Sequence, residues 1–395
     1  MIVTPRRLVW IGVVALAIAM GIGRFAFTPL LPLMLRDGTI NASIGAEWAA
    51  ANYAGYLIGA LSASRFSANP RTGLMLALIG VSLTTLSAAW LGAEARYAGA
   101  VLRAAAGVFS AWTLICASSW CLAELAQRNA ARLGAWIYAG VGLGISAAGV
   151  LAWLGGRQAA SELWMELGLL AAIGTIFIAW GLRGSEAAPA NSNPASPTRK
   201  DRDSAASGEG GNRGLVFCYG TFGFGYIVQA TFLPTMARQQ VSDPLVFGLT
   251  WPLFGAAAAL SVMAAARFLS AWPRRRVWAL AQAVMSVGTA LPLATQALWA
   301  LAVSAVLVGG TFMVATMAGL QLAREFRPDN PMPLLARMTV AFATGQIAGP
   351  LLIRLLGAEA RGGVDAITWT NALATALLGA TAAWLWRPST AVEKN

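Results

Sequence analysis

Apolar segments long enough to cross a lipid bilayer recur from one end of this 395-residue chain to the other. A helix needs about 20 predominantly apolar residues to span the hydrocarbon core. Twelve such segments can be counted, at residues 8–34, 46–66, 72–92, 97–123, 133–154, 161–182, 215–236, 245–266, 277–295, 297–323, 334–356 and 365–386. The sequence therefore predicts an all-α polytopic membrane protein with 12 transmembrane helices, whose short loops leave no room for a soluble catalytic domain.

The basic residues predict the orientation of these helices. If the amino terminus is cytoplasmic, 20 of the 28 Lys and Arg residues lie on the inner side, six on the outer side and two inside spans. Membrane proteins typically carry this excess of positive charge on the cytoplasmic side. Both termini are therefore expected to be cytoplasmic. The net charge of +12 is then explained by topology, and no nucleic-acid partner is expected.

One polar stretch, residues 184–213, separates the first six apolar segments from the last six, and its Pro, Ser and charged residues are typical of a linker. The pattern Gly21-x-Gly23-(x8)-Pro32 recurs 202 residues later as Gly223-x-Gly225-(x8)-Pro234. This repeat predicts two pseudo-symmetric six-helix halves, at 1–183 and 214–395, joined by a cytoplasmic linker at 184–213. It also argues against cleavage of the first segment as a secretory signal, because that segment belongs to the repeated unit.

Arg24 and Arg103 lie inside apolar segments, where an unpaired charge is expensive. At 1.5 Å rise per residue they lie about 15 and 9 Å below the outer boundary of the membrane. A guanidinium at that depth either binds free carbonyls, such as those that Pro29 and Pro32 release in the first segment, or faces a substrate path. Two arginines at similar depth favour a shared site, and their planar forks suit carboxylate or phosphate. Arg24 and Arg103 are therefore predicted to bind an anionic substrate.

Four neutral polar residues are further candidates for substrate binding. In the repeat, Tyr226 takes the position of Arg24. Gln229 is predicted to be buried in the seventh segment, where its amide needs a partner. Asn52 and Gln346 are also predicted at cavity positions, although hydrogen bonds between helices explain them equally well.

The missing residue types narrow the function. The chain has no His, and its acids closest to the apolar segments, Glu47, Glu124 and Glu166, lie at predicted helix ends. A carrier of organic cations normally buries a carboxylate to replace lost hydration, so cation efflux is disfavoured. Proton coupling through a deeply buried side chain is not expected either. No catalytic or metal-binding set can be assembled, so neither enzymatic activity nor a cofactor is predicted.

Four stretches of sequence stand out: GIGRFAFTPLLPLM at residues 21–34, and residues 52–61, 138–144 and 345–350. They resemble the first-helix signature and segments of the second, fifth and eleventh helices of the YbfB/YjiJ family of major facilitator transporters. Arg103-(x3)-Gly107 resembles the fourth-helix motif of the wider superfamily, whose arginine is linked to proton coupling or substrate binding. The resemblance implies a multi-pass transporter of the bacterial inner membrane, with a substrate site between its two halves.

These observations favour a monomeric secondary transporter that moves a small organic solute, and specifically an anion, by alternating access. Two alternatives stay open. The first is efflux of neutral or amphipathic compounds, for which Tyr53, Tyr56, Trp112, Trp120, Tyr226 and Trp251 supply a candidate aromatic wall. The second is a membrane receptor or scaffold that transports nothing.

Overall fold

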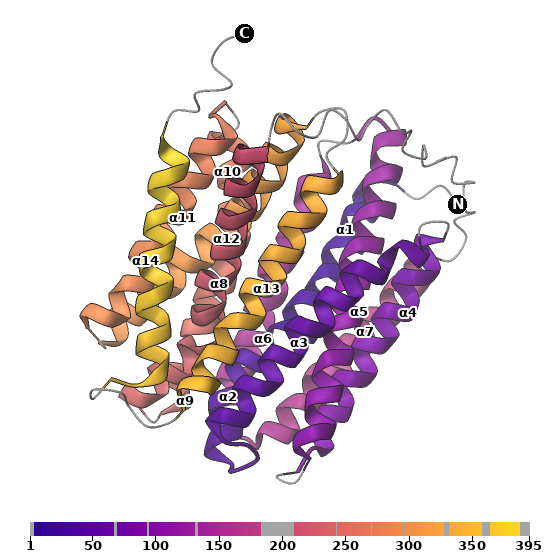
Figure 1. The fold of residues 1–395 in the computed structure, drawn as a ribbon. Coiled ribbons are helices and arrows are strands. Elements are labelled where there is room, and N and C mark those ends of the chain that lie inside the picture. Colours follow the sequence, from indigo (N-terminus) through magenta and orange to yellow (C-terminus); the bar gives the residue numbers. More distant parts are fainter. Residues whose placement is uncertain are drawn as a thin grey trace.

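The computed structural model describes residues 4–66, 69–92, 95–130, 133–182, 209–241, 243–269, 271–295, 297–327, 332–357 and 364–387, and its regular elements over these ranges are all helices (Figure 1). The first part of the chain forms α1 (Pro5–Leu16), the π-helix η1 (Ala17–Arg24), α2 (Phe27–Arg36), α3 (Ala42–Ser62), the short 3-10 helix η2 (Ala63–Phe66), α4 (Pro70–Ser87), the short 3-10 helix η3 (Ala88–Trp90), α5 (Arg96–Gln127), α6 (Gly134–Leu154) and α7 (Ala160–Leu182). The second part forms α8 (Glu209–Gln240), α9 (Pro244–Phe247), α10 (Thr250–Phe268), α11 (Arg274–Ala294), α12 (Leu298–Phe326), α13 (Met332–Leu356) and α14 (Ala366–Trp386).

Nine helical segments in the described part of the chain are long and apolar enough to cross a membrane. The predicted apolar segments that coincide with α3, α10 and α14 are also helical but are not among these nine. Of the predicted linker, residues 184–208 lie outside the described residues, and residues 209–213 form the start of α8. The prediction of an all-helical membrane protein is thus confirmed.

Large aromatic side chains are exposed near the helix ends, as expected at the two interfaces of a bilayer. Trp10, Trp136 and Trp386 lie near the ends where α1 and α6 begin and α14 finishes, and each is more than half exposed. Trp90, the last residue of η3, and Tyr97, the second residue of α5, are 71% and 75% exposed. Side chains of this amphipathic type are stable where hydrocarbon meets water, so they are suited to mark the two membrane boundaries.

The first predicted span is not one regular helix. Thr4 caps α1 by accepting from the backbone N–H of Arg7, and the chain then widens into the π-helix η1, where Phe25 N–H reaches back five residues to Met20 O at 3.1 Å. Such π segments often occur at functional sites. At Thr28 the spacing of the backbone hydrogen bonds shortens from five residues to three, because its N–H donates to Phe25 O at 3.1 Å. Because Pro29 has no N–H, this region loses regular backbone bonds and leaves carbonyls that need other donors.

The helices from the two ends of the sequence gather on opposite sides of the molecule, as the colours of Figure 1 show. The two groups meet where α6 packs against α10, α3 against α13, and α2 against α8. The α6–α10 contact is a backbone contact: a Cβ built on Gly142 would lie 2.4 Å from Ala259 N, and one built on Gly255 would lie 2.4 Å from Ser146 N. Small residues allow transmembrane helices to approach this closely.

Gly21 is predicted to be intolerant of any side chain. A Cβ there would lie 2.2 Å from the carbonyl carbon of Gly144 on α6, so Gly21→Ala forces η1 and α6 apart. Overpacking of this kind costs about 1–3 kcal/mol. We expect a lower unfolding temperature in detergent and less protein in the membrane. Gly310→Ala is the matched control, because its nearest neighbour would be at an ordinary 3.8 Å; equal behaviour of the two variants would contradict the prediction.

Candidate functional site

A cavity of about 700 Å³ lies between η1, α3, α5 and α6 on one side and α8, α12 and α13 on the other. It reaches Arg324 near the end of α12 and Gly134 at the start of α6, and we call this end of the molecule the inner end and the opposite one the outer end. The described residues that line it are Met20, Arg24, Phe25, Tyr56, Leu114, Ile115, Ser118, Ser119, Leu122, Gly134, Tyr138, Val141, Tyr226, Phe312, Met313, Thr316, Met317, Leu320, Gln321, Arg324 and Phe342. These residues include two arginines and no acid.

Arg24, the last residue of η1, lines the deep part of this cavity and is 3% exposed. Its Nη2 donates to Gln346 Oε1 on α13 at 2.6 Å, and Gln346 Nε2 in turn donates to the Tyr226 hydroxyl on α8. The guanidinium carbon lies 4.0 Å from the centre of the Tyr56 ring, a cation–π distance. Its Nε is buried and has no partner among the described residues. The charge is thus held by a neutral amide and aromatic rings, and no carboxylate in the described part of the chain neutralises it.

Three stacked rings form the wall opposite η1. Tyr226 lies between Phe312 of α12 and Phe342 of α13, with ring centres 5.4 and 5.7 Å away and planes within 10° of parallel. Phe312 continues the stack to Phe254 at 5.6 Å. This packing fixes the Tyr226 hydroxyl toward Gln346, so the orientation of that amide toward Arg24 follows from the aromatic stack.

Hydrogen bonds close the protein on the outer side of Arg24. The Thr28 hydroxyl donates to Ala230 O at 2.7 Å, a contact between two positions 202 residues apart that the internal repeat makes equivalent. The Tyr53 hydroxyl and Thr231 Oγ1 are 2.8 Å apart. These contacts join α2 and α3 to α8, so within the described structure the cavity is closed between Arg24 and the outer end.

An ion pair adds to this closure near the outer end. Glu47 on α3 accepts from Arg96 at 2.7 Å, and its Oε2 lies 3.6 Å from Nη2 of Arg354 on α13. Because α13 comes from the second part of the chain, Glu47 ties the two groups of helices together. In the described part of the chain, the contacts of Thr28, Tyr53 and Glu47 thus all join the two groups of helices on the outer side of Arg24.

Arg103 is not among the described residues that line this cavity. Its Nη1 donates to Gly23 O at 3.1 Å and its Nη2 to Arg24 O at 3.0 Å. In a regular helix Arg24 O would accept from the N–H of Thr28, which here bonds Phe25 O instead. Arg103 therefore supplies donors to carbonyls that the irregular first span leaves free, whereas its buried Nε, like that of Arg24, has no partner among the described residues.

The profile of a family described as "Uncharacterised MFS-type transporter YbfB" matches residues 16–383, nearly the whole chain. The chain belongs to this family of major facilitator transporters. No curated protein that was compared matches the transporter.

Solved structures of transporters have the same fold. The crystal structure of a D-xylose-proton symporter aligns with a TM-score of 0.74 at 12% identity, covering 97% of both chains. The nucleoside transporter NupG aligns with a TM-score of 0.70 at 15% identity, covering 96% of this chain and 98% of its own, and its D323A mutant aligns at 0.71 and 14%. At these identities the likeness concerns the fold alone.

The remaining predicted site residues of the transporter fall into two groups. Tyr226 lines the cavity and Gln346 bridges it to Arg24, so these two meet Arg24 as described above. Asn52 and Gln229 are not among the described residues that line the cavity. Asn52 Nδ2 donates to Arg103 O at 2.9 Å, and Gln229 Nε2 donates to Asn371 Oδ1 at 2.9 Å. Both are fully buried and join neighbouring helices, the alternative that was open for Asn52 from the sequence.

Sequence reasoning missed three of the residues that shape the cavity. Phe312 and Phe342 are single aromatics in apolar segments, where nothing in the local pattern distinguishes a cavity wall from helix packing. Arg324 follows the apolar segment 297–323, where an arginine is typical of the membrane boundary, and the structure places it on the cavity lining. The sequence feature that predicts Arg324 at the cavity is its position near the end of α12, a helix that also supplies Phe312 to the lining.

Proposed function

We propose that this protein is a secondary transporter that moves a small organic anion by alternating access, with Arg24 as the binding charge. The main support for this proposal is the Arg24 guanidinium, which no carboxylate neutralises in a cavity whose described lining contains no acid. In a low-dielectric site such a charge attracts a carboxylate or phosphate strongly, and the fork of an arginine suits their oxygens. The unpartnered Nε is a donor that a substrate oxygen can satisfy.

The size and lining of the cavity suit a partly apolar anion. Its volume of about 700 Å³ is in the usual range for drug-sized ligands. Phe25 and Tyr56 lie against the Arg24 guanidinium, and Tyr226, Phe312 and Phe342 line the same cavity. An acid with an aromatic or otherwise apolar body can place its charge on Arg24 and its body against these rings.

The membrane arrangement that we propose follows the charge distribution and the repeat. Residues 1–183 and 214–395 form two six-helix halves, the intervening linker is cytoplasmic, and both termini face the cytoplasm of a bacterial inner membrane. The inner end of the cavity is then cytoplasmic, so the described conformation is inward-facing. The substrate site lies between the halves, and the protein works as a monomer.

The test of the proposed function is a thermal-unfolding screen of the purified protein against carboxylates, phosphates and neutral drugs. A ligand that binds only the folded state raises the unfolding temperature. We expect stabilisation by at least one organic anion and none by its neutral amide, which has the same shape without the charge. Stabilisation by neutral compounds alone, unchanged in Arg24→Ala, would support efflux of neutral or amphipathic molecules instead, which the aromatic wall of the cavity also suits.

A second prediction concerns the closed outer end. Glu47→Gln removes the charge that holds Arg354, and we expect it to shift the population toward an outward-facing state. Pulsed EPR measures this shift with spin labels on cysteines introduced at the exposed positions Ser43 and Gln239. We expect a larger fraction of molecules with a long distance between the two labels. The three native cysteines are buried and take up little label. Glu166→Gln, at an exposed site, is the control; identical distance distributions in both variants would rule out the gating role.

A third prediction concerns energy coupling. Glu47, Glu124 and Glu166 lie outside the described lining of the cavity, and Glu124 is paired with Arg128 on the next helical turn. We therefore expect substrate exchange, facilitated diffusion or a proton carried by the substrate itself. In proteoliposomes, replacing any of the three by Gln is expected to leave the ratio of pH-gradient-driven uptake to substrate exchange unchanged. Selective loss of the gradient-driven part in one variant would identify that residue as a proton carrier.

A further inference from the structure

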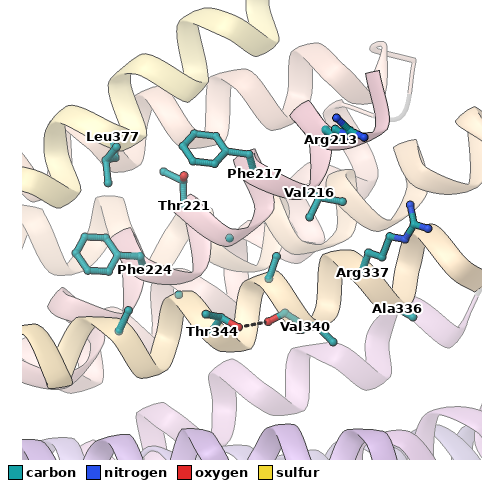
Figure 2. A pocket seen from close by; sticks show the side chains of 14 residues that line it. Arg213, Val216, Phe217, Thr221, Phe224, Ala336, Arg337, Val340, Thr344 and Leu377 are labelled. Atoms are coloured by element: carbon teal, nitrogen blue, oxygen red, sulfur yellow. Dashed lines mark hydrogen bonds between the residues drawn. The ribbon is translucent and has the colours of Figure 1, made fainter. Parts of the chain in front are cut away.

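A second hollow, distinct from the substrate cavity, lies between α8 and α13 and beside α14 (Figure 2). We call it the α8–α13 groove; it has a volume of about 880 Å³. Its lining contains two arginines, Arg213 and Arg337, and two threonines, Thr221 and Thr344, which sit on the groove wall (Figure 2). The other residues that line it are apolar or glycine.

The groove faces away from the substrate cavity. On α8 its residues Phe217, Thr221 and Phe224 recur every three or four positions and so share one helix face, whereas Tyr226 points into the substrate cavity. Phe217 is 61% exposed and Val340 is 39% exposed. In a membrane-embedded helix bundle, exposed apolar side chains at this level contact lipid, so the groove opens toward hydrocarbon.

The shape of the groove follows from a close helix crossing. A Cβ on Gly345 would lie 2.2 Å from Gly220 O, so α8 and α13 touch through their backbones and no side chain fills the space beside the contact. Farther along, Phe224 packs with Val228 and Ala374 into a small apolar cluster that includes Leu377 at its edge. This cluster closes the deep end of the groove.

Both arginines lie at the other end of the groove, as Figure 2 shows. On α8 the last lining residue is Phe224, and on α13 it is Ala348. Each lies 11 positions after the arginine of its helix, which corresponds to about 16 Å along an α-helix. One leaflet of a bilayer contributes about 15 Å of hydrocarbon. The groove therefore has the length of one leaflet, with two cations at the level of the headgroups. Arg337 is exposed, and within the described part of the chain it has neither a hydrogen bond nor an ion pair.

We propose that the α8–α13 groove binds an anionic phospholipid from the leaflet at the inner end of the molecule. The headgroup phosphate, which no ammonium neutralises, lies between Arg213 and Arg337, and one acyl chain occupies the apolar groove as far as Phe224. Cations just outside the hydrocarbon attract anionic lipid, and two together select it over a zwitterionic one. Because α13 also supplies Gln346, a lipid bound here contacts a helix that holds the substrate site.

Native mass spectrometry of the purified protein with equal amounts of phosphatidylglycerol and phosphatidylethanolamine, carrying the same acyl chains, tests this proposal. We expect preferential retention of phosphatidylglycerol, reduced by about fivefold for each arginine lost in Arg213→Gln, Arg337→Gln and the double variant. Arg267→Gln removes an exposed cation from the end of α10 and is the matched control, expected to bind lipid like the wild type.

A groove-filling variant makes the test independent of the arginines. Thr344→Trp places a large ring in the groove from an exposed position and leaves both cations in place, so we expect it to lose phosphatidylglycerol as well. Unchanged lipid preference in the double arginine variant, or full retention in Thr344→Trp, would overturn the proposal. So would displacement of the lipid by glycerol phosphate at equal concentration, since that would show a site for free phosphate without need of the groove.

Discussion

Arg24→Ala is expected to abolish anion binding and transport while the protein still folds and inserts. Removing one partner of a buried charge pair costs about 2–5 kcal/mol, which corresponds to a loss of affinity of roughly 30-fold or more. The protein itself loses the hydrogen bond to Gln346 and the contacts of the guanidinium with the rings of Phe25, Tyr53 and Tyr56. Uptake into proteoliposomes and ligand-induced thermal shifts measure the loss.

Arg24→Lys tests whether the positive charge is sufficient for binding without the geometry of the guanidinium. A lysine keeps the positive charge but not the planar fork, so we expect clearly impaired binding also in this variant. Arg157→Ala, on the exposed turn between α6 and α7, is the control and is expected to transport like the wild type. Transport at wild-type rates by Arg24→Ala would show that the guanidinium serves packing only and would remove the basis of the anion proposal.

Arg103→Ala is expected to act through folding and not through binding. The variant leaves the carbonyls of Gly23 and Arg24 without donors in a buried part of the first span. Unsatisfied buried groups cost about 1–3 kcal/mol each. Since removal of a buried cation offsets part of this cost, we expect a net loss of roughly 2 kcal/mol in the free energy of unfolding. Thermal unfolding of the ligand-free protein, and its yield in the membrane, measure the effect.

The contrast between the two arginines makes the prediction specific. Arg24→Ala should keep the unfolding temperature of the free protein and lose its response to ligand, whereas Arg103→Ala should lower the former. Asn52→Ala is expected to lower the unfolding temperature less than Arg103→Ala does, because it removes only the hydrogen bond from Asn52 on α3 to the Arg103 carbonyl. If Arg103→Ala has wild-type stability but no longer responds to ligand, Arg103 binds substrate and our prediction is wrong.

Arg24 and Arg103 illustrate how far the sequence could be interpreted. Both were recognised as functional candidates from their depth, because the cost of an unpaired charge in hydrocarbon does not depend on the details of the fold. Their different uses were not predictable. Arg103 meets the carbonyls of Gly23 and Arg24 only because η1 widens into a π-helix and Thr28 bonds a nearer carbonyl.

The candidate site shows the same division among neutral residues. Gln346 and Asn52 had the same two interpretations from the sequence, a cavity position or a hydrogen bond between helices. In the structure Gln346 joins Arg24 to Tyr226, whereas Asn52 bonds the backbone of Arg103 outside the cavity lining. The difference lies in the rotation of each helix about its axis, which apolar segments of this kind do not encode locally.

The sequence alone is enough to predict a helical membrane transporter of the YbfB family with a rare cation inside its first span. These properties follow from transfer free energies and motif residues, which are local and add along the chain. The structure was needed to see that Arg24 shares a cavity with Tyr226 and Arg324, that Arg103 donates to free carbonyls of the first span, and that Glu47 and Thr28 close the outer end. Those outcomes depend on helix rotation, register and a local backbone irregularity, which are set jointly by contacts between residues as far as 322 positions apart.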